Sequence, residues 1–166
     1  MSKSIKKAVY AGSFDPFTVG HHDIVKRALH LFDELILLVL PNHSKKSLFS
    51  IEARIRMLQA VFGQQTNIRI DTYDSLTVDY LKNHQIQFLL RGIRSVGDLE
   101  KEQHLSWNNK SINPEIDTFF LMSAPEHLAV SSSLVRELLS YRHPVYSYIP
   151  KSMQKAFDLE WSLLKC

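Results

Sequence analysis

Two arginines follow an apolar run in the middle of the sequence, within "LLRGIRSVGDLEKEQ". Arg91 and Arg94 lie three residues apart, and Gly92 stands between them. Within a turn, this spacing lets two guanidinium groups converge on one anion, and their planar forks match the oxygens of a phosphate or carboxylate. The segment therefore favours an anion-binding site over a solvated surface turn.

A second candidate is the stretch "YAGSFDPFTVGHHDIVKRA", which holds two of the five glycines of the chain. Gly12 allows close backbone approach, and Gly20 lies in the first turn of a predicted helix, whose free N–H groups attract anions. Neighbours on a helix point about 100° apart, so only one of His21 and His22 faces a given ligand. His21, beside Gly20, is placed to donate a hydrogen bond to an oxyanion.

Other interpretations of this histidine segment stay open. The stretch is also compatible with an ordinary structural turn. A metal site built from His21, His22 and Asp23 is disfavoured, because ligands that are contiguous in sequence rarely converge on one ion.

Two further segments carry phosphate-binding residue types. In "NHSKKSLFS", Lys45 and Lys46 follow an apolar run, and lysine is a movable point charge that commonly binds phosphate, although a solvated loop is the plain alternative. In "VSSSLVREL", three serines precede a predicted helix. One serine is explained as an N-cap, and the others add hydroxyl and N–H groups for a phosphate cradle.

Familiar nucleotide and hydrolase motifs are missing from the sequence. It contains neither the dinucleotide fingerprint G-x-G-x-x-G nor the phosphate loop G-x-x-x-x-G-K-[ST]. The nucleophile elbow G-x-S-x-G is also missing, which disfavours a nucleophilic serine.

The elements that must position these residues alternate between strands and helices. Apolar runs with little alternation are typical of buried parallel strands, and five occur: Ala8–Ala11, Leu35–Leu40, Ile68–Ile70, Phe88–Leu90 and Thr118–Met122. Segments with helical periodicity lie between these runs. In the first, Ile24, Ala28 and Leu31 lie on one face; in the second, the apolar positions are Ile51, Ile55, Leu58 and Phe62, followed by a Gly63 C-cap. Further helices are predicted over residues 78–81, 99–107, 134–139 and 150–164. This order predicts an α/β fold, a doubly wound five-stranded parallel sheet, in one domain over residues 1–166.

Such folds bind ligands where the strands end at their carboxyl edge. The candidate segments named above all follow a predicted strand or open the next helix. We therefore expect them to gather at one edge of the sheet.

Composition narrows the class of protein. The chain of 166 residues is 45% hydrophobic with a formal charge of +3, an excess too small to indicate nucleic-acid binding. Its single cysteine, Cys166, cannot form an internal disulfide or a cysteine-based zinc site, which fits a reducing compartment. No apolar run approaches the ~20 residues of a membrane helix, and no signal peptide is evident, so we expect a cytoplasmic protein without membrane contact.

Taken together, these segments resemble the phosphopantetheine adenylyltransferase family of the nucleotidyltransferase superfamily. The resemblance runs from about Lys7 to Leu164 and is carried by "GSFDPFTVGHHDIVKRA", "SKKSLFSIEAR", "LLRGIRSVGDLEKE" and "FLMSAPEHLAVSSSLVRE". The Thr18-Val19-Gly20-His21 motif alone indicates only the superfamily. Four positions carry residues that are less usual in the family: Ser13, Thr77, Lys101 and His127. The residues that the resemblance assigns to phosphate handling are unaffected by these departures.

The resemblance implies a Rossmann-like nucleotidyltransferase fold and transfer of an adenylyl group from ATP to 4′-phosphopantetheine, giving dephospho-coenzyme A and pyrophosphate. It implies Mg²⁺ carried with ATP and a homohexamer. Its catalytic positions are His21, Lys45 and Arg94. Its ATP-binding positions are Ser13, Phe14, His21, Gly92, Ile93, Arg94, Glu102, His127, Leu128, Ala129, Val130, Ser131, Ser132 and Ser133. Its phosphopantetheine-binding positions are Ser13, Lys45, Thr77, Arg91, Asn109 and Glu137.

Two rival functions remain at this point. One is a different small-molecule nucleotidyltransferase, for example one that acts on nicotinamide mononucleotide. The other is a nucleotide- or RNA-binding module without turnover, which the joint presence of His21, Lys45 and Arg94 disfavours.

Overall fold

The computed structural model describes residues 5–41 and 46–164 of the chain. Its five strands form one sheet: β1 (Lys7–Gly12), β2 (Glu34–Val39), β3 (Ile68–Thr72), β4 (Phe88–Ile93) and β5 (Asp117–Met122). The helices are α1 (Val19–Ala28), α2 (Ile51–Phe62), α3 (Thr77–Asn83), α4 (Val96–Ile112), α5 (Ser132–Ser140) and α6 (Gln154–Leu163). Short 3₁₀ turns cover Pro125–His127, Tyr146–Tyr148 and Lys151–Met153. The predicted strands and α/β class are confirmed.

All strand pairs are parallel, and the strand order is β3-β2-β1-β4-β5. The chain therefore builds the sheet outward from β1 to β3, returns to the other side of β1 and continues with β4 and β5. This reversal lies between β1 and β4. In open α/β sheets, the crevice at such a reversal is where ligands bind.

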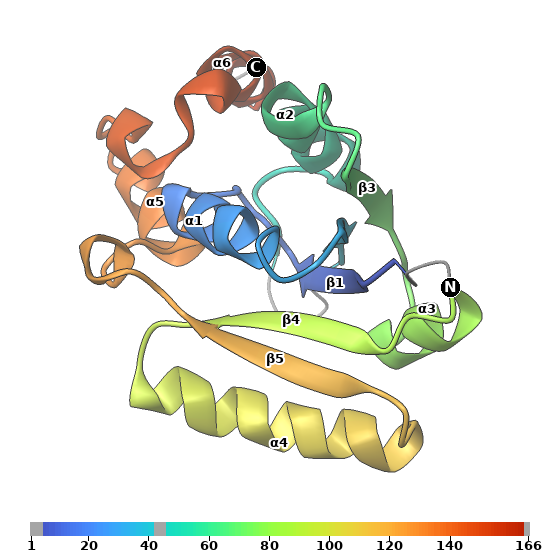
Figure 1. The fold of residues 1–166 in the computed structure, drawn as a ribbon. Helices are drawn as coiled ribbons and strands as arrows, with labels where there is room; N and C mark the ends of the chain where they lie inside the picture. The colour runs from blue at the N-terminus through green and yellow to red at the C-terminus, as the bar shows by residue number, and fades with distance from the viewer. Residues whose placement is uncertain (1–4, 42–45, 165–166) are drawn as a thin grey trace.

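Helices cover both faces of the sheet (Figure 1). On one face lie α1, α2, α5 and α6, and on the other lie α3 and α4. Alternate residues of β1 enter different clusters, since Ala8 and Tyr10 join one and Val9 and Ala11 the other. A strand buried on both faces has a continuous apolar run, which is why the sequence pattern identified β1, and β2 alternates between the same two clusters.

Helix α2 follows the sequence prediction closely. It runs from Ile51 to Phe62, and the Gly63 N–H donates to the Gln59 carbonyl at 2.8 Å as the helix ends. The Ser50 hydroxyl accepts from the Ala53 N–H and caps its start. Ser50 therefore caps the start of the helix, and the helix ends at the predicted Gly63, although the backbone of this glycine is right-handed, with φ of −61°.

The prediction that Leu31 shares a buried face with Ile24 and Ala28 is wrong. Helix α1 ends at Ala28, and Leu31 lies in the following turn with 52% of its surface exposed. Phe32 enters the core instead. The 3.6-residue period places a side chain only while the helix continues.

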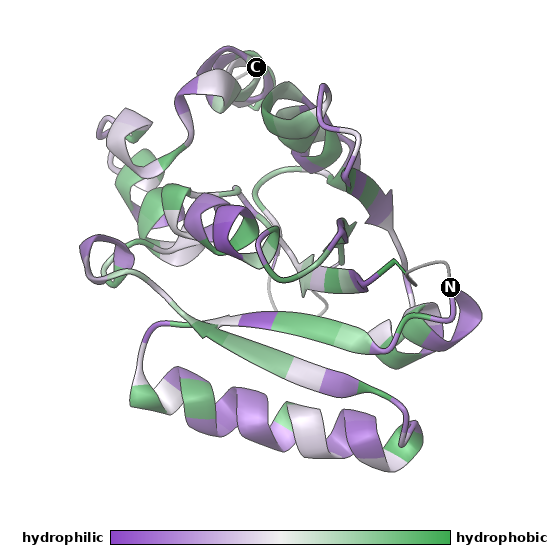
Figure 2. Ribbon diagram, in the orientation of Figure 1, coloured by the Kyte–Doolittle hydropathy of each residue, from purple (hydrophilic) through white to green (hydrophobic). Residues whose placement is uncertain are grey.

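Helix α4 is longer than predicted and has no buried residue along its length. Val96 is 84% exposed and Trp107 is 58% exposed. Figure 2 shows hydrophilic and hydrophobic residues mixed along α4, whereas the neighbouring strand β4 is largely hydrophobic. The irregular periodicity of this segment reflects a helix that covers the sheet edge without an apolar stripe of its own.

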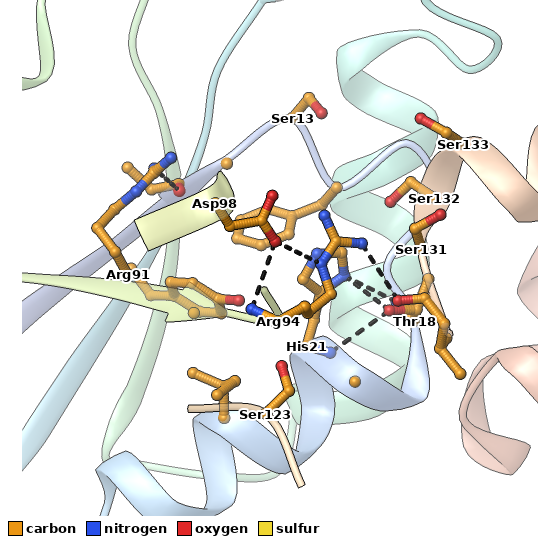
Figure 3. Close-up of a pocket in the computed structure, with 18 of the residues that line it drawn as sticks. Ser13, Thr18, His21, Arg91, Arg94, Asp98, Ser123, Ser131, Ser132 and Ser133 are labelled. Carbon is orange, nitrogen blue, oxygen red and sulfur yellow. Dashed lines mark hydrogen bonds and ion pairs between the residues drawn. The ribbon is translucent and has the colours of Figure 1, made fainter. Parts of the chain in front are cut away.

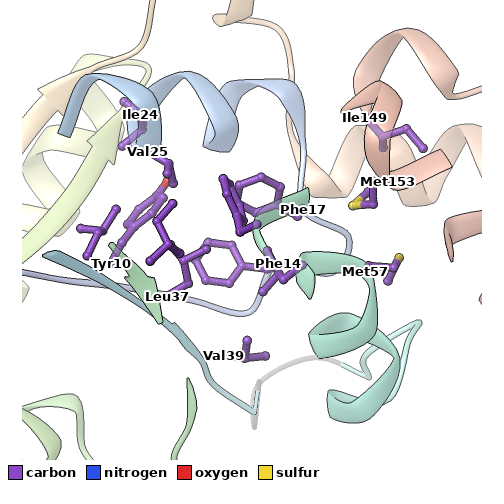
Figure 4. Close-up of a cluster of buried hydrophobic side chains, with 14 of the residues drawn as sticks. Tyr10, Phe14, Phe17, Ile24, Val25, Leu37, Val39, Met57, Ile149 and Met153 are labelled. Carbon is purple, nitrogen blue, oxygen red and sulfur yellow. The ribbon is translucent and has the colours of Figure 1, made fainter. Parts of the chain in front are cut away.

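The loop between β1 and α1 is anchored in the larger core cluster. Phe14 and Phe17 from this loop pack with Tyr10 and Leu37 beneath α1 (Figure 4). The rings of Phe14 and Phe17 meet edge to face, with centroids 5.5 Å apart. Core packing therefore holds the loop that carries the histidine motif.

No helix in residues 5–41 and 46–164 is long and apolar enough to cross a membrane.

Candidate active site

A pocket opens where β1 and β4 end, at the reversal of the sheet. Segments far apart in the sequence line it: the loop after β1, the start of α1, the end of β4, the start of α4 and the start of α5. Figure 3 shows His21, Arg91, Arg94 and the serines around this space. The expected gathering at the carboxyl edge is thus observed for the histidine, arginine and serine segments, whereas Lys45 lies outside the described residues and Lys46 does not line this pocket.

Many of the residues proposed from sequence line this first pocket. They are Ser13, Phe14, His21, Arg91, Gly92, Arg94, Glu102, Val130, Ser131, Ser132 and Ser133. A second pocket on the other side of the sheet includes Thr77 and Asn109. The two pockets share Arg91 and Glu102 as a common wall.

The described linings of both pockets leave out the remaining candidates: Ile93, His127, Leu128, Ala129 and Glu137. The side chain of Ile93 is fully buried. His127 lies near the rim, since a Cβ atom built on Gly20 would be 3.6 Å from the His127 Cβ. Lys45 lies outside the described residues, and Lys46 is exposed.

Thr18 holds the His21 ring in one orientation. The Thr18 N–H donates to His21 Nδ1 at 3.1 Å, while the His21 N–H donates to Thr18 Oγ1 at 3.4 Å. This reciprocal pair is a capping box in which histidine takes the usual place of glutamate. Because a backbone N–H is always a donor, Nδ1 is the acceptor and the neutral ring carries its proton on Nε2.

The surroundings of His21 keep its ring neutral. Burial, together with the positive charges of Arg94 and Arg91, lowers the pKa of His21 to about 3. Rings of Phe14 and Phe17 pack around the imidazole, with centroids 5.3 Å and 5.4 Å from it. The neutral His21 ring can therefore donate a hydrogen bond from Nε2 near neutral pH, and it carries no second proton to release.

His22 has a different environment from its neighbour. Its ring packs against Phe62, with centroids 5.7 Å apart, outside the described pocket lining. The expectation that only one of the two histidines faces the ligand site therefore agrees with the geometry.

The two arginines are held by carboxylates. Arg91 donates from Nε and Nη2 to both oxygens of Glu102, at 2.6 Å and 2.5 Å, and from Nη1 to the Ala11 carbonyl at 2.8 Å. Arg94 donates from Nε to Asp98 Oδ2 at 3.3 Å and from Nη1 to the Val130 carbonyl at 3.3 Å. These contacts orient both guanidinium groups before any anion arrives.

The three serines divide their roles. Ser131 caps α5, and its hydroxyl accepts from the Leu134 N–H at 3.0 Å. Ser132 donates its hydroxyl proton to the Pro16 carbonyl at 2.8 Å, and Ser133 Oγ accepts from Arg136 at 3.1 Å. Only the Ser132 proton is used in these bonds, so the hydroxyls of Ser131 and Ser133 and the free N–H groups at the start of α5 can still donate to an anion.

Gly12 has a role that the sequence did not indicate. A Cβ atom at this position would lie 3.0 Å from Phe14 Cε1, so the space beside Gly12 is occupied by the Phe14 ring. Phe14 itself has a left-handed backbone, with φ of 47°. The absence of a side chain at Gly12 therefore permits the folded-back loop, and because Gly12 also lines the pocket, the close approach of a ligand to its backbone stays a prediction.

Sequence reasoning missed several pocket residues, among them Asp98 and Arg136. Arg136 donates to the Asp15 carbonyl at 2.6 Å and to Ser133, so it joins α5 to the loop after β1. A usable signal existed, because Arg136 is three residues after Ser133 and residues at this spacing share a helix face. Asp98 is four residues after Arg94, and these two residues form another pair at helical spacing.

We predict that the His21 ring does not titrate between pH 5 and 8 in the folded protein and carries its proton on Nε2. Two-dimensional ¹⁵N NMR of the imidazole groups measures both properties. The ring has an ordinary pKa of 6.5 when it is unshielded, so the unfolded chain takes up the proton first as the pH falls. His21 therefore lowers the free energy of unfolding progressively below about pH 6.5.

A His21→Gln variant provides the control, since its stability should depend less on pH in the range 4 to 6. A titration midpoint near 6.5 for His21, or a proton on Nδ1, would contradict this account of the ring.

Comparisons with known proteins agree with the geometry. The cytidylyltransferase-like family model matches residues 9–138. The phosphopantetheine adenylyltransferase of Thermosynechococcus vestitus is 44% identical over 153 residues, covering 92% of this chain and 90% of that protein.

Two further relatives have the same printed name. The phosphopantetheine adenylyltransferase of Leptospira biflexa is 44% identical over 156 residues, covering 94% of this chain and 98% of that protein. The one of Geotalea daltonii is 39% identical over 158 residues, covering 95% and 98%. With matches of this extent, the chain belongs to the phosphopantetheine adenylyltransferase family of cytidylyltransferase-like proteins.

Proposed function

We propose that this protein transfers the adenylyl group of ATP to 4′-phosphopantetheine, releasing pyrophosphate and forming dephospho-coenzyme A. One observation carries the proposal most strongly: a neutral His21 lies beside Arg91 and Arg94 in a pocket at the reversal of the sheet. The family relationship identifies the two substrates.

In this reaction, an oxygen of the acceptor's phosphate attacks the α-phosphorus of ATP. A new oxygen–phosphorus bond forms, the bond from the α-phosphorus to the bridging oxygen breaks, and pyrophosphate leaves. Since the attacking phosphate is already an anion, the protein has no need of a nucleophile or a strong base. Placing two bound reactants correctly can supply about 7–11 kcal/mol of the barrier reduction.

We assign the charge-stabilising roles to donors that the structure already orients. His21 would donate from Nε2 to an oxygen of the α-phosphoryl group, where negative charge develops. Arg94 and the free N–H groups that start α5 would bind the phosphates of ATP. Oriented donors of this kind need little reorganisation during the reaction, which is the basis of their effect.

The two pockets suit the two substrates. The first pocket contains most of the proposed ATP positions, and the second contains Thr77 and Asn109, which we assign to the phosphopantetheine arm. Arg91 and Glu102 line both pockets, so the substrates would meet at their common wall. Ser13 and Lys45 are proposed to act where the substrates meet, while Ile93, His127 to Ala129 and Glu137 stay predictions from the family.

We propose that Mg²⁺ enters on the phosphate oxygens of ATP. Among the described lining residues of the first pocket, Asp98 and Glu102 are the carboxylates, and both pair with arginines. No group of three or more histidine, cysteine, aspartate or glutamate residues in residues 5–41 and 46–164 could hold a metal ion. This donor set fits a cation held mainly by the nucleotide and water, which Mg²⁺ favours, and when bound it would neutralise phosphate charge.

A cytoplasmic location stays a prediction, based on the single cysteine of the chain.

The reaction is tested by measuring pyrophosphate release from ATP with phosphopantetheine and with a panel of other phosphorylated acceptors. We expect turnover with phosphopantetheine and its loss when excess EDTA removes Mg²⁺. A preference for nicotinamide mononucleotide would reassign the protein to a different small-molecule nucleotidyltransferase. ATP or RNA binding without pyrophosphate release from any acceptor would favour the non-catalytic binding module.

A His21→Ala variant tests the proposed donor. We expect turnover to fall by about 10²-fold or more, the scale of one oriented donor to a transition-state oxyanion, with much smaller change in ATP affinity. His22→Ala is the matched control, because His22 packs on Phe62 outside the described lining. Equal losses of ATP affinity and turnover in His21→Ala would mean that His21 serves uniform substrate binding.

We also propose that the protein forms a homo-oligomer, a hexamer by analogy with the family. Exposed apolar side chains on α4 and β5 support association: Trp107 is 58% exposed and Met122 is 54% exposed. Static light scattering after size-exclusion chromatography should give a mass of about six chains. A monomer mass across micromolar concentrations would rule out the proposal.

A further inference from the structure

A buried arginine outside both pockets hydrogen-bonds to backbone carbonyls of residues that line them. Arg54, at the end of the first turn of α2, is only 2% exposed. Its Nη1 donates to the Ser13 carbonyl at 2.7 Å and to the Leu40 carbonyl at 3.1 Å, and its Nε donates to the Ser50 carbonyl at 3.2 Å. One side chain thus holds backbone from the ends of two strands and from the start of a helix.

The carbonyls that Arg54 holds belong to the walls of the site. Ser13 follows β1 and lines the first pocket, whereas Leu40 follows β2 and lines the second. The Leu40 N–H donates to the Gly12 carbonyl at 3.0 Å, so the two strand ends already touch. Arg54 is absent from the described lining of either pocket. It would therefore act on substrates only through the backbone that it holds.

The loop after β1 is fastened to the same region a second time. The Asp15 carboxylate accepts from the N–H groups of Leu48 and Phe49, at 2.8 Å and 2.9 Å. Together with Arg54, it connects residues 13–15 to residues 48–50 in both directions. This double connection restrains the loop that carries Ser13 and leads to His21.

A role in core packing alone explains a guanidinium at this position less well than a role in holding backbone carbonyls. Among the described residues, no carboxylate lies within ion-pair distance of Arg54. Burial lowers the pKa of Arg54, while the charges of Asp15 and Glu52 raise it. Burying a cation is costly, and its partners are three carbonyls whose positions a planar fork can set together. Lysine has a single nitrogen and cannot reproduce this fork.

We propose that Arg54 is a positioning residue for adenylyl transfer, which fixes the Ser13 and Leu40 backbones so that the two bound substrates are aligned for reaction. This inference rests on the proposed function. Misplacement by about 1 Å can cost about 10²-fold in rate, even when binding is retained.

The test compares Arg54→Lys and Arg54→Met with Arg56→Met. Arg56 is two residues away on the same helix, 53% exposed, and pairs with the buried Glu160 of α6. Its substitution should lower the thermal unfolding midpoint without moving the site. We expect kcat to fall about 10- to 100-fold in Arg54→Lys, with KM for both substrates within about 3-fold of wild type, and kcat to stay near wild type in Arg56→Met.

Amide hydrogen exchange gives a readout that does not require activity. In Arg54→Lys, we expect exchange in residues 11–17 and 38–41 to rise at least 10-fold, because the carbonyls lose their common donor. Arg56→Met should leave these segments protected and increase exchange in α6. If Arg54→Met does not fold, Arg54→Lys alone decides the comparison.

The outcomes separate this proposal from the function on which it rests. Wild-type kcat and exchange in Arg54→Lys would overturn it, as would an equal loss of kcat in an Arg56→Met variant of equal thermal stability. If the wild-type protein forms no dephospho-coenzyme A, the proposed function fails, and so does alignment for that reaction. An exchange difference would then show that Arg54 holds the backbone without showing a role in transfer.

Discussion

Burial of β1 on both faces is the constraint on which the site depends. Its central residues, from Ala8 to Ala11, alternate between two apolar clusters, so this part of the strand is committed to the core on both faces. Most of the polar side chains that line the crevice come from the ends of the strands and from the segments that follow them. Because the sheet reverses its direction of growth between β1 and β4, the loops that follow these two strands open into the same crevice. The topology therefore brings the histidine motif and the arginine pair together.

The same burial determines the electrostatics of the crevice. Desolvation and the nearby arginines keep His21 neutral, and the Thr18 N–H leaves its proton on the nitrogen that is free to donate. The arginines are restrained by Glu102 and Asp98, and therefore need little reordering when an anion binds. A crevice of this kind suits chemistry between two bound phosphates, in which the protein positions reactants and stabilises charge.

Much of this arrangement could be predicted, and the failures have identifiable causes. Apolar runs predicted all five strands, and β1 and β2 show the reason most clearly, because strands buried on both faces lack polar alternation. Leu31 was misplaced because periodicity does not reveal where a helix ends, and α4 was underestimated because its sequence has no regular apolar stripe. The roles of the proposed site residues, Lys45 included, and the division of the chain into one domain stay predictions.

The sequence by itself determined the α/β alternation, the chemistry of the candidate residues and the family resemblance, because all three depend on residue type and local spacing. The tertiary structure decided which partners these residues have. It showed that Arg91 pairs with Glu102, that Ser132 binds the Pro16 carbonyl, and that Arg54 joins backbone from β1, β2 and α2. Such contacts connect residues far apart in the chain, and only the packing of helices against the sheet brings them within hydrogen-bond distance.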